Sequence, residues 1–397
     1  MKQNRSFLAL AVAVFLQMVG VGMIVALLPS RMINLSGSME YVGYIPSAFA
    51  VSFLVFQIPL GYLGDRYGYK IFLVGGYILS GLTGVVYFLS ESVWGILGGR
   101  VLQGIGEVAA WALAPALISL LFRQAKGEAL GKYNGAMHLG LTAGGLLSVY
   151  AYSLWSGNEA FLFYAAVGFV SALVVALFVE NPKISLGEGT KKPLEYSQIL
   201  PCLKKVRALA VLGGICLYGG SYGAFISVVP GVLLSEKGFS QTQVALFFAL
   251  FYIAISVSQV LAGRFSDRRG REGTMYMGLL LEILGLTPFM WLTGGMIFLL
   301  LFVASFGLGM FCVAAMAFLN EAVPDSLKGS ISGIFFVFWG VGFFFVPPIM
   351  THVAGIVGYP VLFLGFSALL LLELLALKLR NRSVLRNYYG FEKSMNF

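Results

Sequence analysis

The sequence predicts an all-α membrane protein with twelve transmembrane helices, arranged as two pseudo-symmetric six-helix bundles. Of its 397 residues, 59% are hydrophobic and only 11% are charged, and the mean hydropathy is +0.88. A water-soluble protein needs a more polar surface than this composition allows. The charged residues gather between apolar stretches of roughly twenty residues, the length that crosses a bilayer as a helix. An internal repeat, which relates the two halves of the chain, completes the prediction.

Each apolar stretch of suitable length is expected to form one span. An even number of spans places both termini on one side of the membrane. Lysine and arginine crowd that side, whereas only Arg31 and Lys237 fall on the other, so the basic side is expected to be cytoplasmic. The expected helices cover residues 6–29, 41–63, 71–90, 94–119, 132–155, 160–179, 206–235, 241–262, 273–292, 295–320, 329–354 and 359–379.

The basic residues also explain the formal net charge of +9. Their position on the cytoplasmic side fits the orientation rule and contact with anionic lipid, so membrane lipid is an expected partner and nucleic acid is not. The cysteines Cys202, Cys216 and Cys312 show neither a disulfide framework nor the spacing of a metal site. We therefore expect a multi-pass protein of the cell membrane that binds no metal.

The longest polar stretch, from about Glu180 to Arg207, divides the chain. It contains NPKISLGEGTKKP, which has the glycine, proline and charge content of a linker. The expected parts are an N-terminal bundle over 1–180, a cytoplasmic linker over 181–206, a C-terminal bundle over 207–380 and a cytoplasmic tail over 381–397.

The two halves repeat each other at a constant spacing of 202 residues. The decapeptide GYLGDRYGYK at 61–70 nearly recurs as GRFSDRRGRE at 263–272. Parallel halves with six spans each are a transporter architecture that places substrate near the midplane, between the halves. The residues that match at this spacing are Gln57 and Gln259, Gly61 and Gly263, Asp65 and Asp267, Gly68 and Gly270, and Gly131 and Gly333.

These decapeptides resemble the loop signature of the major facilitator superfamily and its degenerate second copy. GRVLQGIGE at 99–107 resembles the family's helix-four signature, an arginine followed by Gln-Gly-x-Gly. GLTAGG at 140–145 resembles the helix-five signature of the antiporter branch, but Leu141 stands where that branch has proline. The resemblance covers the whole chain. It implies a monomeric secondary transporter that works by alternating access, with helices one, four, seven and ten lining a central cavity.

The loop signature is expected to form a conformational gate. Its glycines let helices approach closely, and its aspartate can accept hydrogen bonds at a helix N-terminus. We expect Asp65 and Asp267 each to hold a helix start in the opposite half, with Asn320 and Glu321 joining the network. The alternative is a set of ordinary loop charges. The expected gate residues are Gly61, Asp65, Arg66, Gly68, Lys70, Gly263, Asp267, Arg268, Gly270 and Arg271.

Charged residues inside a span are candidates for function, because burying a charge at the bilayer centre costs at least about 2.5–3.5 kcal/mol. Arg100 and Glu107 lie on one face of the expected helix 94–119. We assign both to proton coupling; the alternative is an internal salt bridge that only fixes helix packing. By the resemblance, the substrate cavity is expected to be lined by Gln17, Gln103, Glu107, Trp111, Tyr218 and Tyr222.

Four further titratable residues lie inside expected spans. For His138 and His352 we favour packing roles, although either can titrate at physiological pH. Glu282 and Glu373 fall on helices that resemble the family's peripheral ones. There we expect interhelical hydrogen bonds or protonated carboxyls, and no contact with substrate.

The sequence has no phosphate-binding Gly-Lys-Ser/Thr loop. We therefore expect no enzyme activity and no cofactor, and transport of a small molecule driven by an ion gradient or by the solute's own gradient. The favoured function is proton-coupled efflux of small hydrophobic or weakly cationic compounds, as in a multidrug antiporter. The alternative is proton-coupled uptake of a small organic anion or sugar, with Arg100 as the anion anchor. An uncoupled facilitator is disfavoured, because it needs no acid such as Glu107 at the midplane.

Overall fold

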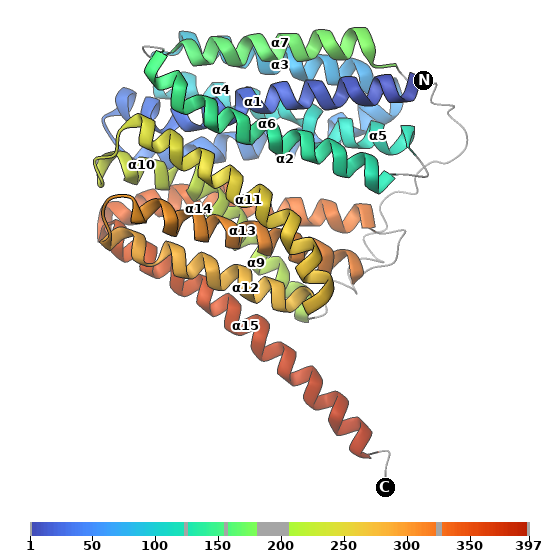
Figure 1. Cartoon of the computed structure of the whole chain (residues 1–397), viewed down its shortest axis with the longest axis vertical. Coiled ribbons are helices and arrows are strands. Elements are labelled where there is room, and N and C mark those ends of the chain that lie inside the picture. Colours follow the sequence, from blue (N-terminus) through green and yellow to red (C-terminus); the bar gives the residue numbers. More distant parts are fainter. Residues whose placement is uncertain (1, 123–125, 155–157, 181–205, 323–327, 395–397) are drawn as a thin grey trace. The chain divides into compact units, whose positions relative to one another are not determined.

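The structure is a computed structural model of the whole chain, and it describes residues 2–122, 126–154, 158–180, 206–322 and 328–394. The described residues form helices and short connections, with no β-strand among them (Figure 1). The expected all-α fold class is confirmed.

The first half of the sequence contributes a long series of helices. At the fourth expected span, 94–119, the elements α4, η2 and α5 follow one another without a break, and η2 is a π-helix. The elements are α1 (Lys2–Ser36), η1 (Glu40–Gly43), α2 (Tyr44–Tyr67), α3 (Tyr69–Leu89), α4 (Val93–Val108), η2 (Ala109–Leu113), α5 (Ala114–Leu121), α6 (Lys126–Leu154) and α7 (Glu159–Phe178).

The second half contributes a matching series. The expected helix at 206–235 is divided into α9 and α10, because the backbone leaves the helical conformation at Ser227. The elements are α9 (Val206–Ile226), α10 (Val228–Ser235), α11 (Gln241–Arg269), α12 (Arg271–Leu286), η3 (Pro288–Trp291), α13 (Met296–Glu321), α14 (Lys328–Val357) and α15 (Tyr359–Ser394).

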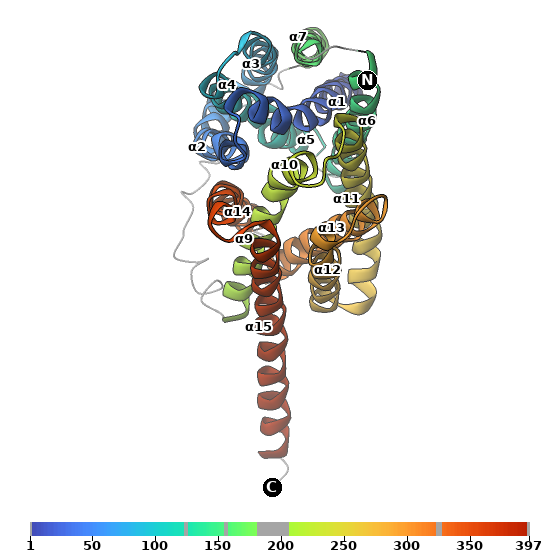
Figure 2. The same ribbon diagram turned by 90° about the vertical axis from the view of Figure 1, so that its left-hand side faces the viewer.

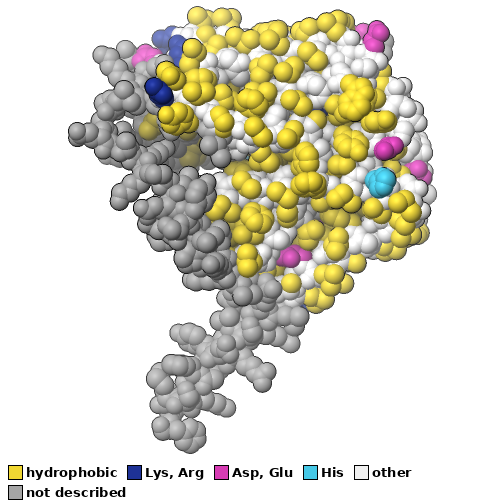
Figure 3. Space-filling model, turned by 180° about the vertical axis from the view of Figure 1, so that it is seen from behind, with side chains coloured by type: hydrophobic (Ala, Val, Ile, Leu, Met, Phe, Trp, Pro, Cys, Tyr) yellow, Lys and Arg dark blue, Asp and Glu magenta, His cyan; other side chains and the backbone are white. Residues whose placement is uncertain are grey.

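Eleven stretches of the described residues are long and apolar enough to cross a membrane. They correspond to the expected spans except the fifth, 132–155. The helix at that place, α6, has 29 residues, but its glycines, serine and tyrosines lower its hydropathy below that of the other spans. Hydrophobic side chains cover most of the face seen in Figure 3, where acidic and basic side chains appear at few places. Such a surface suits contact with acyl chains.

The two copies of the loop signature have the same backbone conformation. Gly68 has φ +93° between α2 and α3, and Gly270 has φ +83° between α11 and α12. Positive φ at these values strains any residue except glycine. The repeat found in the sequence is therefore also present in the backbone.

The same repeat appears in helix packing. Gly22 of α1 lies against the backbone of α6 at Leu141, and Gly219 of α9 lies against the backbone of α14 at Trp339. A Cβ at either position would overlap a carbonyl oxygen, so only glycine allows these helices to approach so closely. Gly223, 201 residues after Gly22, also lies against α14, at the carbonyl of Phe343, which is 202 residues after Leu141.

Contacts between Cα atoms divide the chain into two compact units. Unit 1 comprises Met1–Gly189, Gly223–Ile253 and Phe343–His352, and unit 2 comprises Thr190–Tyr222, Ala254–Gly342 and Val353–Phe397. In unit 1, α3 and α7 lie side by side, and in unit 2, α12 packs along α13 (Figures 1 and 2). The predicted linker 181–206 lies outside the described residues except for Val206, so the predicted domain boundaries remain a prediction.

Unit 1 joins the N-terminal helices to parts of the second half of the sequence. Thr351 Oγ1 of α14 donates a hydrogen bond to the carbonyl of Glu40 at 3.2 Å. Gly231 of α10 lies against the side chain of Met39, and Gly145 of α6 lies against the backbone of α11. In the predicted topology, Met39 and Glu40 lie at the outer surface of the membrane. The contacts of Glu40 with Thr351 and of Met39 with Gly231 therefore join the two halves of the sequence at that surface.

Candidate functional site

A continuous chain of hydrogen bonds runs along α4. Arg100 Nη1 donates to Gln103 Oε1 at 2.8 Å, and Gln103 Nε2 donates to Glu107 Oε1 at 2.7 Å. The indole Nε1 of Trp111 donates to the second carboxyl oxygen, Glu107 Oε2, at 3.0 Å. Steps of three, four and four residues keep these side chains on one helix face. We call these four side chains, Arg100, Gln103, Glu107 and Trp111, the stripe. The structure thus brings together on one face of α4 the residues that were picked out in the sequence.

This chain is buried, and Gln103 separates its two charges. Arg100, Gln103 and Glu107 are 2%, 0% and 3% exposed. No ion pair joins Arg100 to Glu107 in the described structure, since Gln103 bonds to both. The ion pair that the alternative assumed is not formed among the described residues, because seven residues along a helix are too far for direct contact and the amide of Gln103 fills the gap. The choice between a packing role and proton coupling stays a prediction.

Arg100 is also held by other parts of unit 1. Its Nε donates to the carbonyl of Ile45 in α2 at 3.0 Å, and its guanidinium lies 4.9 Å from the ring centroid of Phe49. Tyr87 of α3 donates its hydroxyl to Gln103 Oε1 at 2.7 Å. The stripe is thus held by α2 and α3. Phe49 and Tyr87 could not be predicted from the sequence, because nothing local to them marks a contact with α4.

A π-helix follows the carboxyl directly. In η2 the N–H of Ala114 bonds to the carbonyl of Ala109, five residues back. Pro115 has no N–H to donate to the carbonyl of Trp111, so the normal α-helical bond cannot form there. Tyr133 of α6 donates its hydroxyl to the carbonyl of Ala110 at 2.8 Å. Such wide turns are frequent at functional sites, and Pro115 is the sequence signal that marks this one.

Gln17 lies inside unit 1. Its Nε2 donates to the hydroxyl of Tyr164 in α7 at 3.1 Å, and the residue is 1% exposed. Its Oε1 has no hydrogen-bond partner among the described residues. Gln17 therefore joins α1 to α7, and its predicted contact with substrate remains a prediction.

The two tyrosines assigned to the cavity lie in an aromatic cluster of unit 2. Tyr218 and Tyr222 of α9 pack edge to face, with ring centroids 6.3 Å apart. Tyr218 also contacts Phe311 and Phe335, at 6.3 and 6.4 Å between centroids, and Tyr222 contacts Trp339 at 6.3 Å. The stripe belongs to unit 1 and this cluster to unit 2. A shared cavity stays a prediction.

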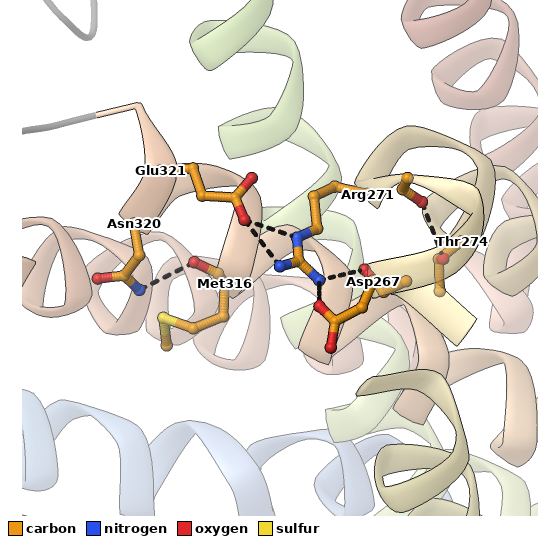
Figure 4. A network of polar contacts seen from close by, with 8 residues as sticks. Asp267, Arg271, Thr274, Met316, Asn320 and Glu321 are labelled. Atoms are coloured by element: carbon orange, nitrogen blue, oxygen red, sulfur yellow. Dashed lines mark hydrogen bonds and ion pairs between the residues drawn. The ribbon is translucent and has the colours of Figure 1, made fainter. Parts of the chain in front are cut away.

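The second copy of the loop signature forms a polar network around Arg271 (Figure 4). Arg271 Nε and Nη2 donate to Glu321 Oε1 at the end of α13, at 2.9 and 2.7 Å. Arg271 Nη1 donates to Asp267 Oδ1 at 2.6 Å and to Ser266 Oγ at 2.9 Å. Asn320 bonds instead to the Met316 carbonyl of its own helix. Glu321 thus joins the network as expected, and Asp267 is held within its own unit.

The first copy lacks this arginine. Tyr69 stands where Arg271 stands in the second copy, and its ring lies against Gly64. The Asp65 side chain lies outside the described atoms, so its predicted helix partner stays a prediction, as does that of Asp267. Lys70 is half-buried at the start of α3.

Other predicted gate residues have local roles. Arg66 lies over the ring of Tyr67, at 5.2 Å from its centroid, and Arg268 is exposed. A Cβ at Gly61 or Gly263 would meet no described atom within 4 Å. Close helix approach therefore does not explain these two glycines in the described structure, whereas positive φ explains Gly68 and Gly270.

Metal chemistry finds no support in the described residues. They contain no group of three or more His, Cys, Asp or Glu side chains that could hold an ion. Cys216 and Cys312 are free thiols.

Long apolar helices in two repeated series, with buried charged residues inside a span, define a multi-pass helical membrane protein of the transporter class. The sequence matches the Major Facilitator Superfamily over residues 10–230 and again over residues 210–393. The chain belongs to this family, and the resemblance read from its motifs is confirmed.

Individual relatives are more distant. The inner membrane transport protein YajR of Escherichia coli is 37% identical over 123 residues, which cover 31% of this chain and 27% of that protein. The class H tetracycline resistance protein of Pasteurella multocida is 22% identical over 377 residues, covering 91% of this chain and 88% of the relative. A crystal structure of a bacterial homologue of the human lysosomal transporter Spinster, inward-facing and unoccupied, has a TM-score of 0.80, with 16% identity and coverage of 97% and 98%. This last likeness shows the fold alone.

Proposed function

We propose that this protein is a proton-coupled exporter of small hydrophobic or weakly cationic compounds, which works by alternating access. The observation that carries the proposal is the environment of Glu107. Its carboxyl is buried inside a span, and Arg100 is linked to it only through the side-chain amide of Gln103. A carboxyl in such a place binds and releases a proton at a cost that depends on its surroundings.

The hydrogen bonds of Glu107 link protonation to movement. Both carboxyl oxygens accept hydrogen bonds, from Gln103 Nε2 and Trp111 Nε1. The indole N–H of Trp111 and the amide nitrogen of Gln103 can each donate a hydrogen bond but cannot accept one. A carboxylate has about four acceptor sites, and these two donors use two of them, so a proton can bind Glu107 at a free site. Protonation removes the charge and weakens both hydrogen bonds. It therefore loosens the contacts of Glu107 with Trp111, which lies in the π-helix η2, and with Gln103, which holds Arg100.

Three observations favour export over uptake of an anion. Arg100 already donates to the carbonyl of Ile45 and to Gln103, and it lies over the ring of Phe49, so part of its guanidinium is committed to contacts within the protein. A tetracycline resistance protein is similar over most of the chain, although at 22% identity. Half-buried Trp111, beside the carboxyl, offers an aromatic surface to a hydrophobic cation.

The test uses the purified protein in proteoliposomes, with ethidium and tetracycline as probes. We expect wild-type protein to concentrate at least one probe when only a pH gradient is imposed. The Glu107→Gln variant should lose this accumulation but retain probe exchange at equal pH, because glutamine imitates the protonated form. Glu236→Gln, at an exposed helix end, is the matched control. Accumulation by Glu107→Gln at the wild-type level would contradict the coupling role, and failure of the wild-type protein with both probes would contradict the substrate class.

A further inference from the structure

Unit 2 buries an acid that the proposed function does not use. Glu282 of α12 is 1% exposed, and its Oε1 has no hydrogen-bond partner among the described residues. Ser221 of α9 is its polar neighbour, fully buried and also without a partner for its hydroxyl in the described structure. Two unsatisfied polar groups therefore lie beside each other in the interior of this unit.

Among the residues that the structure describes, no positive charge compensates Glu282. From α9, Ser221 and Tyr218 face it, and Cys312 of α13 lies beside Tyr218. Glu373 of α15 lies against the α9 backbone two turns away, at Gly214. No described lysine, arginine or histidine forms an ion pair with Glu282.

The position of Glu282 corresponds to the site of unit 1. In unit 1, Gly76 of α3 lies against the Gly106 backbone of α4, and Ser80 packs on Gly106. In unit 2, Gly278 of α12 lies against the Gly307 backbone of α13, and Glu282 packs on Gly307.

Glu282 lies 202 residues after Ser80 and so occupies its place in the repeat. Glu107 directly follows Gly106, whereas Leu308 directly follows Gly307. Each unit therefore buries one acid at the same helix contact, on α4 in unit 1 and on α12 in unit 2.

The Ser221 hydroxyl can donate to the carboxylate, but no described cation compensates its charge, so the buried charged form is unfavourable. A bound proton removes the charge and supplies an O–H, which the Ser221 hydroxyl can accept. We propose that Glu282 is a second, reversible proton-binding site, separate from Glu107 and satisfied by Ser221. This site lies in the other unit and does not depend on Glu107 or on the exported compound.

The test measures protonation directly, without substrate. Infrared difference spectra of the purified full-length protein are recorded between acidic and alkaline buffer, and the protonated-carboxyl C=O bands are compared. Proton uptake per molecule is titrated in parallel. We expect Glu282→Gln to lose one band and to take up one proton fewer than wild type, while Glu107→Gln retains that band. Glu236→Gln is the exposed control. An unchanged spectrum and an unchanged proton count in Glu282→Gln would overturn the proposal.

A second variant guards against misfolding of Glu282→Gln. Ser221→Ala keeps the carboxyl and removes its hydrogen-bond acceptor, so the Glu282 band should move to the higher frequency of a free carboxyl. A band that stays at the same frequency in Ser221→Ala overturns the role of the serine, and with it the proposed site. Both readouts are independent of transport, so a failure of ethidium or tetracycline export leaves their result unaffected.

Discussion

Trp111 donates its indole N–H to Glu107 Oε2 at 3.0 Å, across the point where α4 becomes the π-helix η2. The two residues are four apart, with Glu107 in α4 and Trp111 inside the wide turn of η2. The geometry of this contact therefore depends on the backbone of η2 as well as on side-chain rotamers.

Removing the indole donor should alter the pH dependence of transport. Trp111→Phe keeps an aromatic ring but leaves Glu107 Oε2 without this hydrogen bond, which stabilises the charged form. A hydrogen bond to a charged group contributes about 1.5–3 kcal/mol, and one pH unit corresponds to about 1.4 kcal/mol. The pH profile of probe transport in proteoliposomes should move upward by about one to two units. Trp94→Phe, at the exposed start of α4, should leave the profile in place; a profile unchanged in both variants would show that Trp111 does not influence the proton.

Pro115→Ala should convert η2 towards a regular α-helix. The new N–H can bond to the carbonyl of Trp111, and removing a proline from a helix interior relieves a penalty of about 3 kcal/mol. We expect higher thermal stability together with slower pH-driven transport, because Trp111 and Glu107 lose their geometry.

Pro59→Ala is the control for this variant, since Pro59 lies inside α2 with no π-helix recorded beside it. Equal effects of the two substitutions on transport would argue against a specific role for the π-helix.

Arg271 and Glu321 should be energetically coupled. The guanidinium joins the α11–α12 loop to the end of α13, but its side chain is 23% exposed and that of Glu321 is 59% exposed, so solvent screens the pair. A double-mutant cycle with Arg271→Gln and Glu321→Gln should give a coupling of about 0.2–1 kcal/mol in unfolding experiments. Arg269→Gln in place of Arg271→Gln should give none. A coupling of zero in the first cycle would reduce the network to unconnected surface charges.

The orientation in the membrane can be tested with single cysteines. In a background without native cysteines, Ser36→Cys should react with an impermeant thiol reagent in intact cells, and Ser185→Cys should not. The physical reason is the positive-inside rule, which places the linker and both termini in the cytoplasm. Ser185 belongs to the linker, outside the described residues. Labelling of Ser185→Cys in sealed cells would overturn the predicted topology.

Much of the fold could be predicted from the sequence, because its signals are local. Apolar stretches of membrane-spanning length depend on composition alone, and eleven of the twelve expected spans reappear among the described residues. The repeat around Gly68 and Gly270 was visible as a constant spacing, and both glycines have the positive φ that makes the residue necessary. The stripe from Arg100 to Trp111 followed from helical periodicity.

The contacts of that stripe could not be predicted in the same way. Arg100 bonds to Ile45, 55 residues away, and Gln17 bonds to Tyr164, 147 residues away. Which side chain meets which depends on how each helix is rotated and where it crosses its neighbour. Sequence periodicity identifies a face but not the helix against which that face packs.

By itself, the sequence determined the membrane class, the transporter family, the repeat and the stripe that contains Glu107, because hydropathy, spacing and periodicity are properties of the chain alone. The tertiary structure decided that Gln103 separates Arg100 from Glu107, that Arg271 holds Glu321, and that Glu282 lies beside Ser221 with no cation. These facts depend on distances between side chains on packed helices, and those distances exist only once the helices have come together.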